Sequence, residues 1–173
     1  METLECIRSR RSIRKFKADE IDDETLLSLL ESAIQAPSAG NTQEWHFFII
    51  REQASKQKLA EAAMGQGFLV EAPVVIVVAA DLEEIGRAYG ERGRTLYAIQ
   101  DTAAAIQNLL LAAWDRGLGA CWVGAFSEKA VSDLLALPSN LRRVALIPCG
   151  RPAGMPRKPE REGLEGRVHW EHW

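Results

Sequence analysis

The longest apolar run of the chain, Ala72–Ala80, constrains the fold more than any other segment. Pro73 stands near its start, and the β-branched residues of Val74–Ala79 predict a strand that is buried on both faces. The run is much too short to cross a bilayer as a helix, so it indicates no membrane role. An interior strand of a globular domain is therefore expected.

Other helices and strands are expected before and after this strand. Apolar residues at helical spacing predict helices over residues 22–36, 55–63, 96–114 and 127–137. Short apolar segments predict strands over residues 45–50, 121–126 and 144–149. No internal repeat or low-complexity linker interrupts this order, so a single domain spanning residues 1–173 is expected.

The helix expected over 96–114 has apolar residues on many of its sides, which is typical of a buried helix. Its small residues Ala103, Ala104 and Ala105 allow another helix to approach closely, from this chain or from a second copy. Near the other end of the sequence, Val168–Trp173 has a strand-like composition and two tryptophans that are costly to expose. We expect this tail to dock on another surface, such as a partner subunit.

The composition limits the class of partner. Of the 173 residues, 47% are hydrophobic and 26% are charged, and the formal net charge is −3. These values are typical of a soluble globular protein and argue against a surface that attracts nucleic acid as a whole. Cys6, Cys121 and Cys149 lack metal-ligand spacing and are expected to pack as inert thiols. No signal-peptide pattern is present, so a cytoplasmic protein is expected.

A cluster of positive charge, Arg10–Phe16, stands out against this slightly acidic background. Arginine binds phosphate oxygens bidentately at any working pH, and Ser12 adds a hydrogen-bonding hydroxyl. A basic loop by itself is more often solvated surface, but two other loops favour a ligand. Residues 36–45 are rich in small and amide side chains, and the glycines of 117–126 allow the backbone to approach a planar molecule. Together the three loops indicate a flat heteroaromatic phosphate.

These loops resemble those of the FMN-dependent nitroreductase family. The resemblance covers nearly the whole chain and lies in five segments: RRSIRKF at 10–16, APSAGNTQEW at 36–45, the helix at 101–113, GLGACWVGAF at 117–126 and PCGRP at 148–152. It implies an α+β, three-layer fold in which helices wrap a central mixed sheet. It also implies a homodimer with the long helix in the interface, active sites built from both chains and the C-terminal tail packed on the partner.

The resemblance further implies how the phosphate of FMN is held. Arg10, Ser12 and a late basic residue would bind it, and Arg11 would contribute at least through its backbone. The late basic residue has three candidates, in order of preference Arg161, Lys158 and Arg157.

Other residues are implied to contact the flavin itself. Arg14 would lie under the ribityl chain and the N1/C2 edge, where a cation stabilises the anionic reduced ring. Gln66 would read the pyrimidine edge by donating and accepting hydrogen bonds. The backbone of Trp122, Val123 and Gly124 would lie against the ring, with an N–H of Val123 or Gly124 directed at flavin N5. The partner subunit would supply Pro37, Ser38, Ala39 and Asn41.

The activity implied by the resemblance is oxidoreduction by a ping-pong route. Hydride would pass from NADH or NADPH to flavin N5, and electrons would then pass to a nitroaromatic, a quinone or a related acceptor, without a catalytic side chain. The alternative is a protein of the same fold that stores or senses flavin without turnover. A nucleic-acid-binding role for Arg10–Lys17 is disfavoured by the acidic charge balance.

Some residues depart from the family pattern or invite other interpretations. Glu44 stands where the family commonly has proline, which changes the charge beside the loop, and Glu162-Gly163 replaces a basic residue and a proline. His169 and His172 would point to opposite faces of a strand, so no metal site is expected. His46 has no nucleophile motif near it, so triad chemistry is not indicated.

Overall fold

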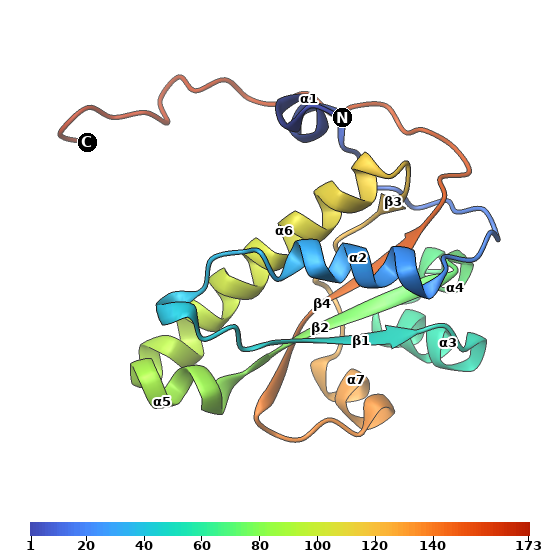
Figure 1. Ribbon diagram of the computed structural model, residues 1–173, viewed down its shortest axis with the longest axis horizontal. Coiled ribbons are helices and arrows are strands. Elements are labelled where there is room, and N and C mark those ends of the chain that lie inside the picture. Colours follow the sequence, from blue (N-terminus) through green and yellow to red (C-terminus); the bar gives the residue numbers. More distant parts are fainter.

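A four-stranded sheet forms the centre of the computed structural model, which describes residues 1–173. The strand order is β1-β2-β4-β3, and neighbouring strands run antiparallel (Figure 1). The strands are β1 Trp45–Ile50, β2 Val74–Asp81, β3 Gly119–Ala120 and β4 Leu141–Gly150. Because β1 and β4 pair with β2 along nearly its whole length, β2 is the interior strand that its composition predicts.

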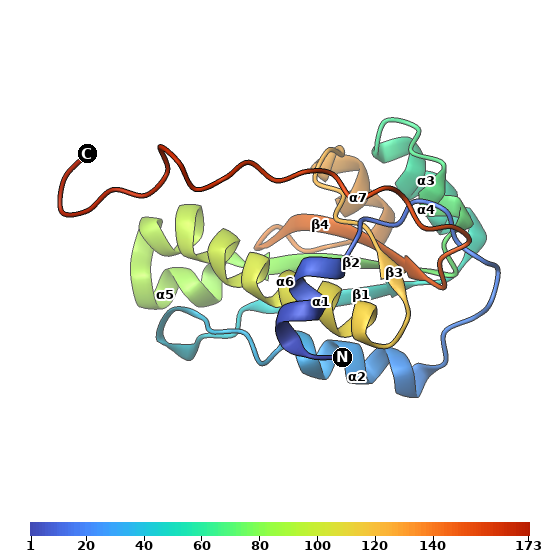
Figure 2. The same ribbon diagram turned by 90° about the horizontal axis from the view of Figure 1, so that it is seen from above.

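Helices cover both faces of the sheet and give the molecule three layers (Figure 1, Figure 2). The helical elements are α1 Thr3–Ser9, α2 Asp23–Ala33, η1 Ala39–Asn41, α3 Gln53–Ala62, α4 Phe68–Glu71, α5 Leu82–Arg92, η2 Gly93–Tyr97, α6 Ala98–Asp115 and α7 Glu128–Leu135. α2 and α6 pack on one face of the sheet, whereas α3, α4 and α7 pack on the other. The expected α+β, three-layer fold is confirmed.

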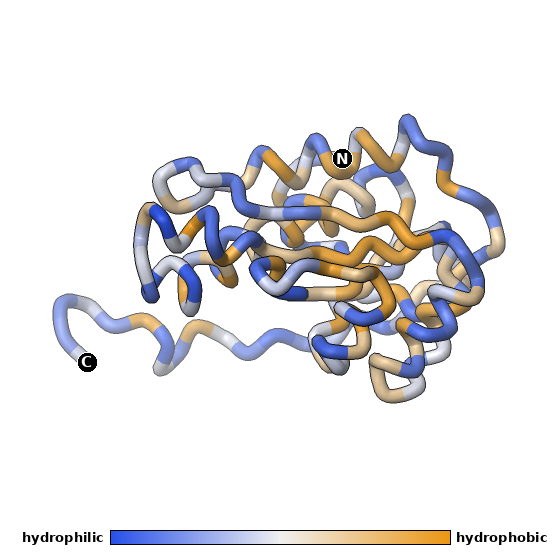
Figure 3. The backbone as a smooth tube through the Cα atoms, turned by 90° about the horizontal axis from the view of Figure 1, so that it is seen from below, coloured by the Kyte–Doolittle hydropathy of each residue, from blue (hydrophilic) through white to orange (hydrophobic).

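The side chains of β2 alternate between two hydrophobic cores. Val74, Ile76 and Val78 belong to the core under α2 and α6, and Val75 and Val77 belong to the core under α3, α4 and α7. All five are fully buried. Figure 3 shows the strands running through the most hydrophobic part of the chain. Since apolar burial is the main stabilising term in folding, this strand links the stability of both cores.

α6 is the buried helix that its sequence predicts, and it connects two ends of the molecule. Near its start, the carboxylate of Asp101 accepts a hydrogen bond of 2.8 Å from the amide of Ala39 in η1. Near its end, the indole N–H of Trp114 donates to the hydroxyl of Ser9 in α1 at 2.8 Å. The helical rise from Asp101 to Trp114 is about 20 Å. α6 therefore holds two of the predicted site loops far apart.

Residues 121–126 do not form the strand that their composition predicts. Only Gly119–Ala120 pairs regularly with β4, after which Val123 makes one isolated bridge to Leu146. The chain leaves the sheet here because it must enter α7, where the hydroxyl of Ser127 accepts from the amide of Ala130 at 3.3 Å. Helix-capping geometry thus overrides strand propensity in this segment.

The remaining differences concern short elements and the tail. Parallel pairing is confined to an isolated bridge between Ser12 and Ala120, so the mixed character implied for the sheet is limited to that bridge. α1, α4 and α5 are additions to the predicted elements. No helix combines the length and the apolar composition needed to cross a membrane.

The tail Val168–Trp173 forms no strand and extends away from the domain (Figure 2). The side chains of Trp170 and Trp173 are 86% and 101% exposed, and Trp173 stacks on His169 with ring centroids 4.4 Å apart. A tail with two exposed tryptophans leaves apolar surface to cover. Its packing on a partner subunit stays a prediction.

Gly119 gives the first test of how the fold positions residues 10–16, which we call the N-terminal loop. A methyl group at this position would overlap the fully buried side chain of Ile13. We expect Gly119→Ala to lower the free energy of unfolding by about 1–3 kcal/mol, because overpacking forces the loop away from β3. Urea denaturation measures this change. Gly154→Ala is the control, since nothing lies within 4 Å of its new methyl; equal stabilities of the two variants would contradict the account.

Candidate functional site

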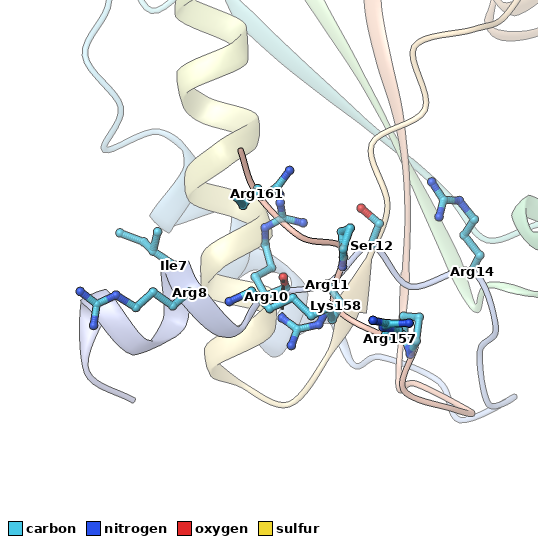
Figure 4. A pocket seen from close by; sticks show the side chains of 11 residues that line it. Ile7, Arg8, Arg10, Arg11, Ser12, Arg14, Arg157, Lys158 and Arg161 are labelled. Carbon is cyan, nitrogen blue, oxygen red and sulfur yellow. Dashed lines mark hydrogen bonds between the residues drawn. The ribbon is translucent and has the colours of Figure 1, made fainter. Parts of the chain in front are cut away.

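A strongly basic cavity of about 620 Å³ lies between the N-terminal loop and the segment that follows β4 (Figure 4). Its wall carries Ser12 and seven cationic side chains: Arg8, Arg10, Arg11, Arg14, Arg157, Lys158 and Arg161. No carboxylate lines the cavity, and none of the seven cations forms an ion pair elsewhere. The site therefore has the charge and the donors to bind an anion.

The N-terminal side of the cavity is fixed by β3 and α1. The amide of Arg10 donates to the carbonyl of Cys6 and ends α1. Ser12 then pairs with Ala120, and the amide of Ile13 donates to the carbonyl of Ala120 at 3.0 Å. Because the Ile13 side chain is fully buried, the loop is anchored on the core while its basic side chains face outward.

The other side of the cavity is brought in by backbone pairing. The amide of Lys17 donates to the carbonyl of Arg151 at 2.9 Å, and the amide of Ala153 donates to the carbonyl of Lys15 at 3.0 Å. These bonds hold residues 151–153, directly after β4, beside the N-terminal loop. The three candidates for the late basic residue then all line the same cavity: Arg157, Lys158 and Arg161.

Arg10 carries the clearest electrostatic signal in the cavity. Burial, followed by repulsion from the neighbouring cation of Arg161, lowers the pKa of the Arg10 guanidinium. Figure 4 shows these two side chains close together, with Arg14 apart on the far side of Ser12. A phosphate between the two guanidiniums would replace repulsion by charge-assisted hydrogen bonds. Of the three late candidates, Arg161 is thus the one coupled to Arg10.

Arg11 differs from its neighbours because its side chain donates hydrogen bonds to nearby backbone carbonyls. One of its terminal nitrogens donates to the carbonyls of Ser9 and Arg10, and its buried Nε has no acceptor. One terminal nitrogen of Arg11 is therefore occupied within the chain, while its side chain still lines the cavity.

Arg14 extends the basic loop toward a second group of predicted residues. Its guanidinium lies over the ring of Phe68, 5.9 Å from the centroid. Close to Phe68 in sequence, Gln66 donates through Nε2 to the carbonyl of Ala63 at 2.9 Å and to that of Ala125 at 3.5 Å. The amide donors of Gln66 are therefore occupied within the chain, which leaves its oxygen as the group free to accept.

Hydrogen bonding distinguishes the amides of Val123 and Gly124. The amide of Val123 donates to the carbonyl of Leu146 at 3.0 Å, so this N–H is occupied within the chain. Gly124 is exposed, and its amide has no acceptor in the chain. Trp122 beside it is 38% exposed. Of these two amides, the one without an acceptor in the chain is that of Gly124.

The remaining predicted residues lie elsewhere in the chain. Pro37, Ser38, Ala39 and Asn41 sit beside the start of α6 and near α5, at the opposite end of α6 from Arg10 (Figure 1). A single chain therefore does not bring them to the basic cavity.

The cysteines match the expectation of inert thiols. Burial raises the pKa of Cys121, although Arg14 and Arg10 act in the opposite direction. Burial also raises the pKa of Cys6, and it raises the pKa of Cys149 to about 12. All three are free thiols in the interior, so packing is their role.

Two groups of residues were missing from the sequence prediction. Arg8 lines the cavity two residues before Arg10, and the basic run continuing into α1 was the available signal. On another surface, donor atoms of His46, Asp81 and Glu84 lie within 4.8 Å of one another. Asp81 caps α5 there by accepting from the amides that follow it, which gives its carboxylate a structural role.

Comparisons with known proteins show the family of this chain. The nitroreductase family model matches residues 7–68 and 62–151. A protein of Archaeoglobus fulgidus, provisionally named an NADH dehydrogenase/NAD(P)H nitroreductase, is 34% identical over 183 residues, with 99% of each protein covered. The NADPH-flavin oxidoreductase of Vibrio harveyi is 30% identical over 147 residues, which cover 80% of this chain and 60% of that protein.

A solved structure gives the same result at the level of the fold. The NADPH:FMN oxidoreductase from Vibrio harveyi, complexed with NAD⁺, superposes with a TM-score of 0.90 at 28% identity and covers 99% of this chain and 77% of that one. The chain belongs to the nitroreductase family. It is accordingly an enzyme of the NAD(P)H oxidoreductase class.

The repulsion between Arg10 and Arg161 predicts that Arg161→Gln has opposite effects on Tm in the absence and in the presence of an anion. Arg161→Gln removes the cation that repels Arg10, so we expect it to raise the Tm of the ligand-free protein by about 1 °C at low salt. In added phosphate the wild type should gain more Tm than the variant. Differential scanning fluorimetry measures both. The control Arg87→Gln changes an exposed arginine on α5; equal phosphate shifts in all three proteins would contradict the prediction.

Proposed function

We propose that the chain is an FMN-dependent oxidoreductase that uses NADH or NADPH to reduce a small-molecule acceptor. The observation that carries the proposal is the cavity with seven cations and no carboxylate, at the place where the basic motif meets the tail. Family membership supports a flavin and a nicotinamide donor. The basic cavity supports a flavin that ends in a phosphate, which FMN does and riboflavin does not.

The donor set fits such a phosphate. Arg10 and Arg161 offer two guanidinium forks close together, and Ser12 offers a neutral donor beside them. The repulsion that lowers the pKa of Arg10 is what a dianion would relieve. We assign these three residues to the phosphate.

The ring of the flavin is assigned to the residues that continue from this cavity. Arg14 would stabilise negative charge on the reduced ring, and the free amide of Gly124 would donate to its reactive edge. The oxygen of Gln66 is left to accept from the pyrimidine edge. In this proposal the backbone of Val123 supports Gly124 by its bridge to β4.

A second copy of the chain would complete the site. Ser38–Asn41 lies about 20 Å from the basic cavity along α6, so in a homodimer these residues would serve the cofactor of the partner. The partly buried Ala103 and Ala104 on α6 offer a close-packing surface for that contact. The exposed tryptophans of the tail offer a second one.

The chemistry needs little from protein side chains. When bound, FMN supplies two-electron transfer between a nicotinamide and an acceptor such as a nitroaromatic or a quinone. The chain binds the phosphate, orients the ring and stabilises its charge. No acid or base is assigned, because protons are available from water.

Spectroscopy on the purified protein tests this function. We expect flavin absorbance, retention of added FMN, and bleaching of the absorbance under anaerobic conditions on addition of NADH or NADPH. A protein that binds no FMN would contradict the proposal. Bound FMN that neither nicotinamide reduces would instead favour a flavin-storing or flavin-sensing protein.

Arg14 provides a residue-level test of the proposed site. We expect Arg14→Ala to raise the Kd for FMN by on the order of tenfold and to slow flavin reduction, with little effect on the free energy of unfolding, because the side chain is exposed. Arg87→Ala is the matched control, since Arg87 is an exposed arginine on α5. An Arg14→Ala protein that binds and reduces FMN like the control would remove Arg14 from the site.

A further inference from the structure

Glu44 is a fully buried carboxyl group in the loop that leads into β1. Its Oε2 lies 2.7 Å from the hydroxyl of Thr42, which also lies 3.0 Å from the carbonyl of Ala39. Its Oε1 is buried and has no hydrogen-bond partner in the chain. A buried carboxylate oxygen without a donor is costly, so this atom requires a proton or a partner.

The group that faces Glu44 is a second carboxyl, that of Asp101 on α6. Asp101 is 8% exposed, and its Oδ2 accepts the 2.8 Å hydrogen bond from the amide of Ala39. Burial raises the pKa of Glu44 most; the Thr42 hydroxyl opposes this, and the adjacent Asp101 carboxyl raises it further. Two carboxyl groups side by side in the interior cannot both ionise without a large penalty.

The surrounding elements provide no compensating cation. No lysine or arginine lies within 4.0 Å of either carboxyl. From β2, Asp81 donates only its amide, to the carbonyl of Glu44 at 2.7 Å. From α5, the Tyr89 hydroxyl lies against Gly40. From η2, Tyr97 packs near Ala39 and accepts from Arg92 at 2.9 Å.

We propose that Glu44 and Asp101 share one proton, and that this proton makes them a positioning pair for the Ser38–Asn41 loop. The Oε1–H of Glu44 donates to Asp101, and Asp101 in turn accepts from the amide of Ala39. The loop is thereby tied to α6 through a neutral acid and one carboxylate. If the proposed function holds, these hydrogen bonds also fix the position of the Ser38–Asn41 loop, which would contact the flavin of the partner.

The shared proton makes the loop sensitive to rising pH. In the folded protein Glu44 keeps its proton above its ordinary pKa, whereas in the unfolded chain it loses the proton at that value. Its stabilising contribution is therefore complete below the ordinary pKa of a glutamate and is lost as the pH rises toward the folded pKa. In that interval the unfolding equilibrium constant rises by up to about tenfold per pH unit.

Urea denaturation of the cofactor-free protein between about pH 5 and about pH 9 tests the shared proton. We expect the wild type to lose stability with rising pH relative to Glu44→Gln, because the amide of glutamine donates to Asp101 at every pH. Asp101→Asn should reduce the slope, since asparagine accepts from Ala39 and donates to Glu44, whereas burial continues to raise the pKa of Glu44. Glu31→Gln, at an exposed position of α2, is the control and should keep the wild-type slope.

Infrared spectroscopy of the folded wild type observes the proton directly. As the pH is raised above the ordinary pKa of a glutamate, the wild type should keep the carbonyl band of one protonated carboxylic acid, and Glu44→Gln should lack that band. A wild type without that band, or with the same pH slope as Glu44→Gln, would overturn the shared proton.

The pH dependence of the Kd for FMN tests the link to the cofactor separately. We expect the Kd of the wild type to rise with increasing pH relative to that of Glu44→Gln, in which the phosphate of FMN still titrates but residue 44 does not. FMN binding with the same pH dependence in both proteins would overturn the positioning role. Failure to bind FMN at any pH would refute the proposed function, whereas the cofactor-free slope and the infrared band would still decide the shared proton.

Discussion

The burial of β2 on both faces is the constraint on which the rest of the structure depends. Its side chains alternate between two cores, so helices must cover both faces of the sheet. α6 lies against one face and contacts both the N-terminal loop and η1. The position of the basic cavity and that of the Ser38–Asn41 loop are therefore both consequences of how α6 packs on this strand.

The basic cavity is defined by cationic side chains that have no carboxylate partner. Arg10 and Arg161 come from segments far apart in the sequence. They meet because residues 151–153 pair with residues 15–17. Their repulsion is a cost to the ligand-free fold that a bound anion would remove. The Glu44–Asp101 pair at the other end of α6 is the opposite case, two acids without a cation, for which a proton takes the place of the counterion.

The sequence predicts those parts of the structure that depend on local pattern. Strand 45–50 and the interior strand follow from β-branched and aromatic runs, and the N-terminal side of the cationic cavity follows from a motif whose residues are close in sequence. The strand over 121–126 is not formed, because the pairing stops where the chain enters α7. The occupied amide of Val123 depends on its register with Leu146, and the burial of Glu44 depends on α6. Neither is encoded by neighbouring residues.

A crystal structure of the protein with FMN tests the central claim most directly. The account predicts the phosphate within hydrogen-bonding distance of Arg10 and Ser12, with the ring beside Gly124 of the same chain and Ser38–Asn41 of a second copy. A phosphate bound away from the basic cavity would contradict it, as would a ring enclosed by one chain alone.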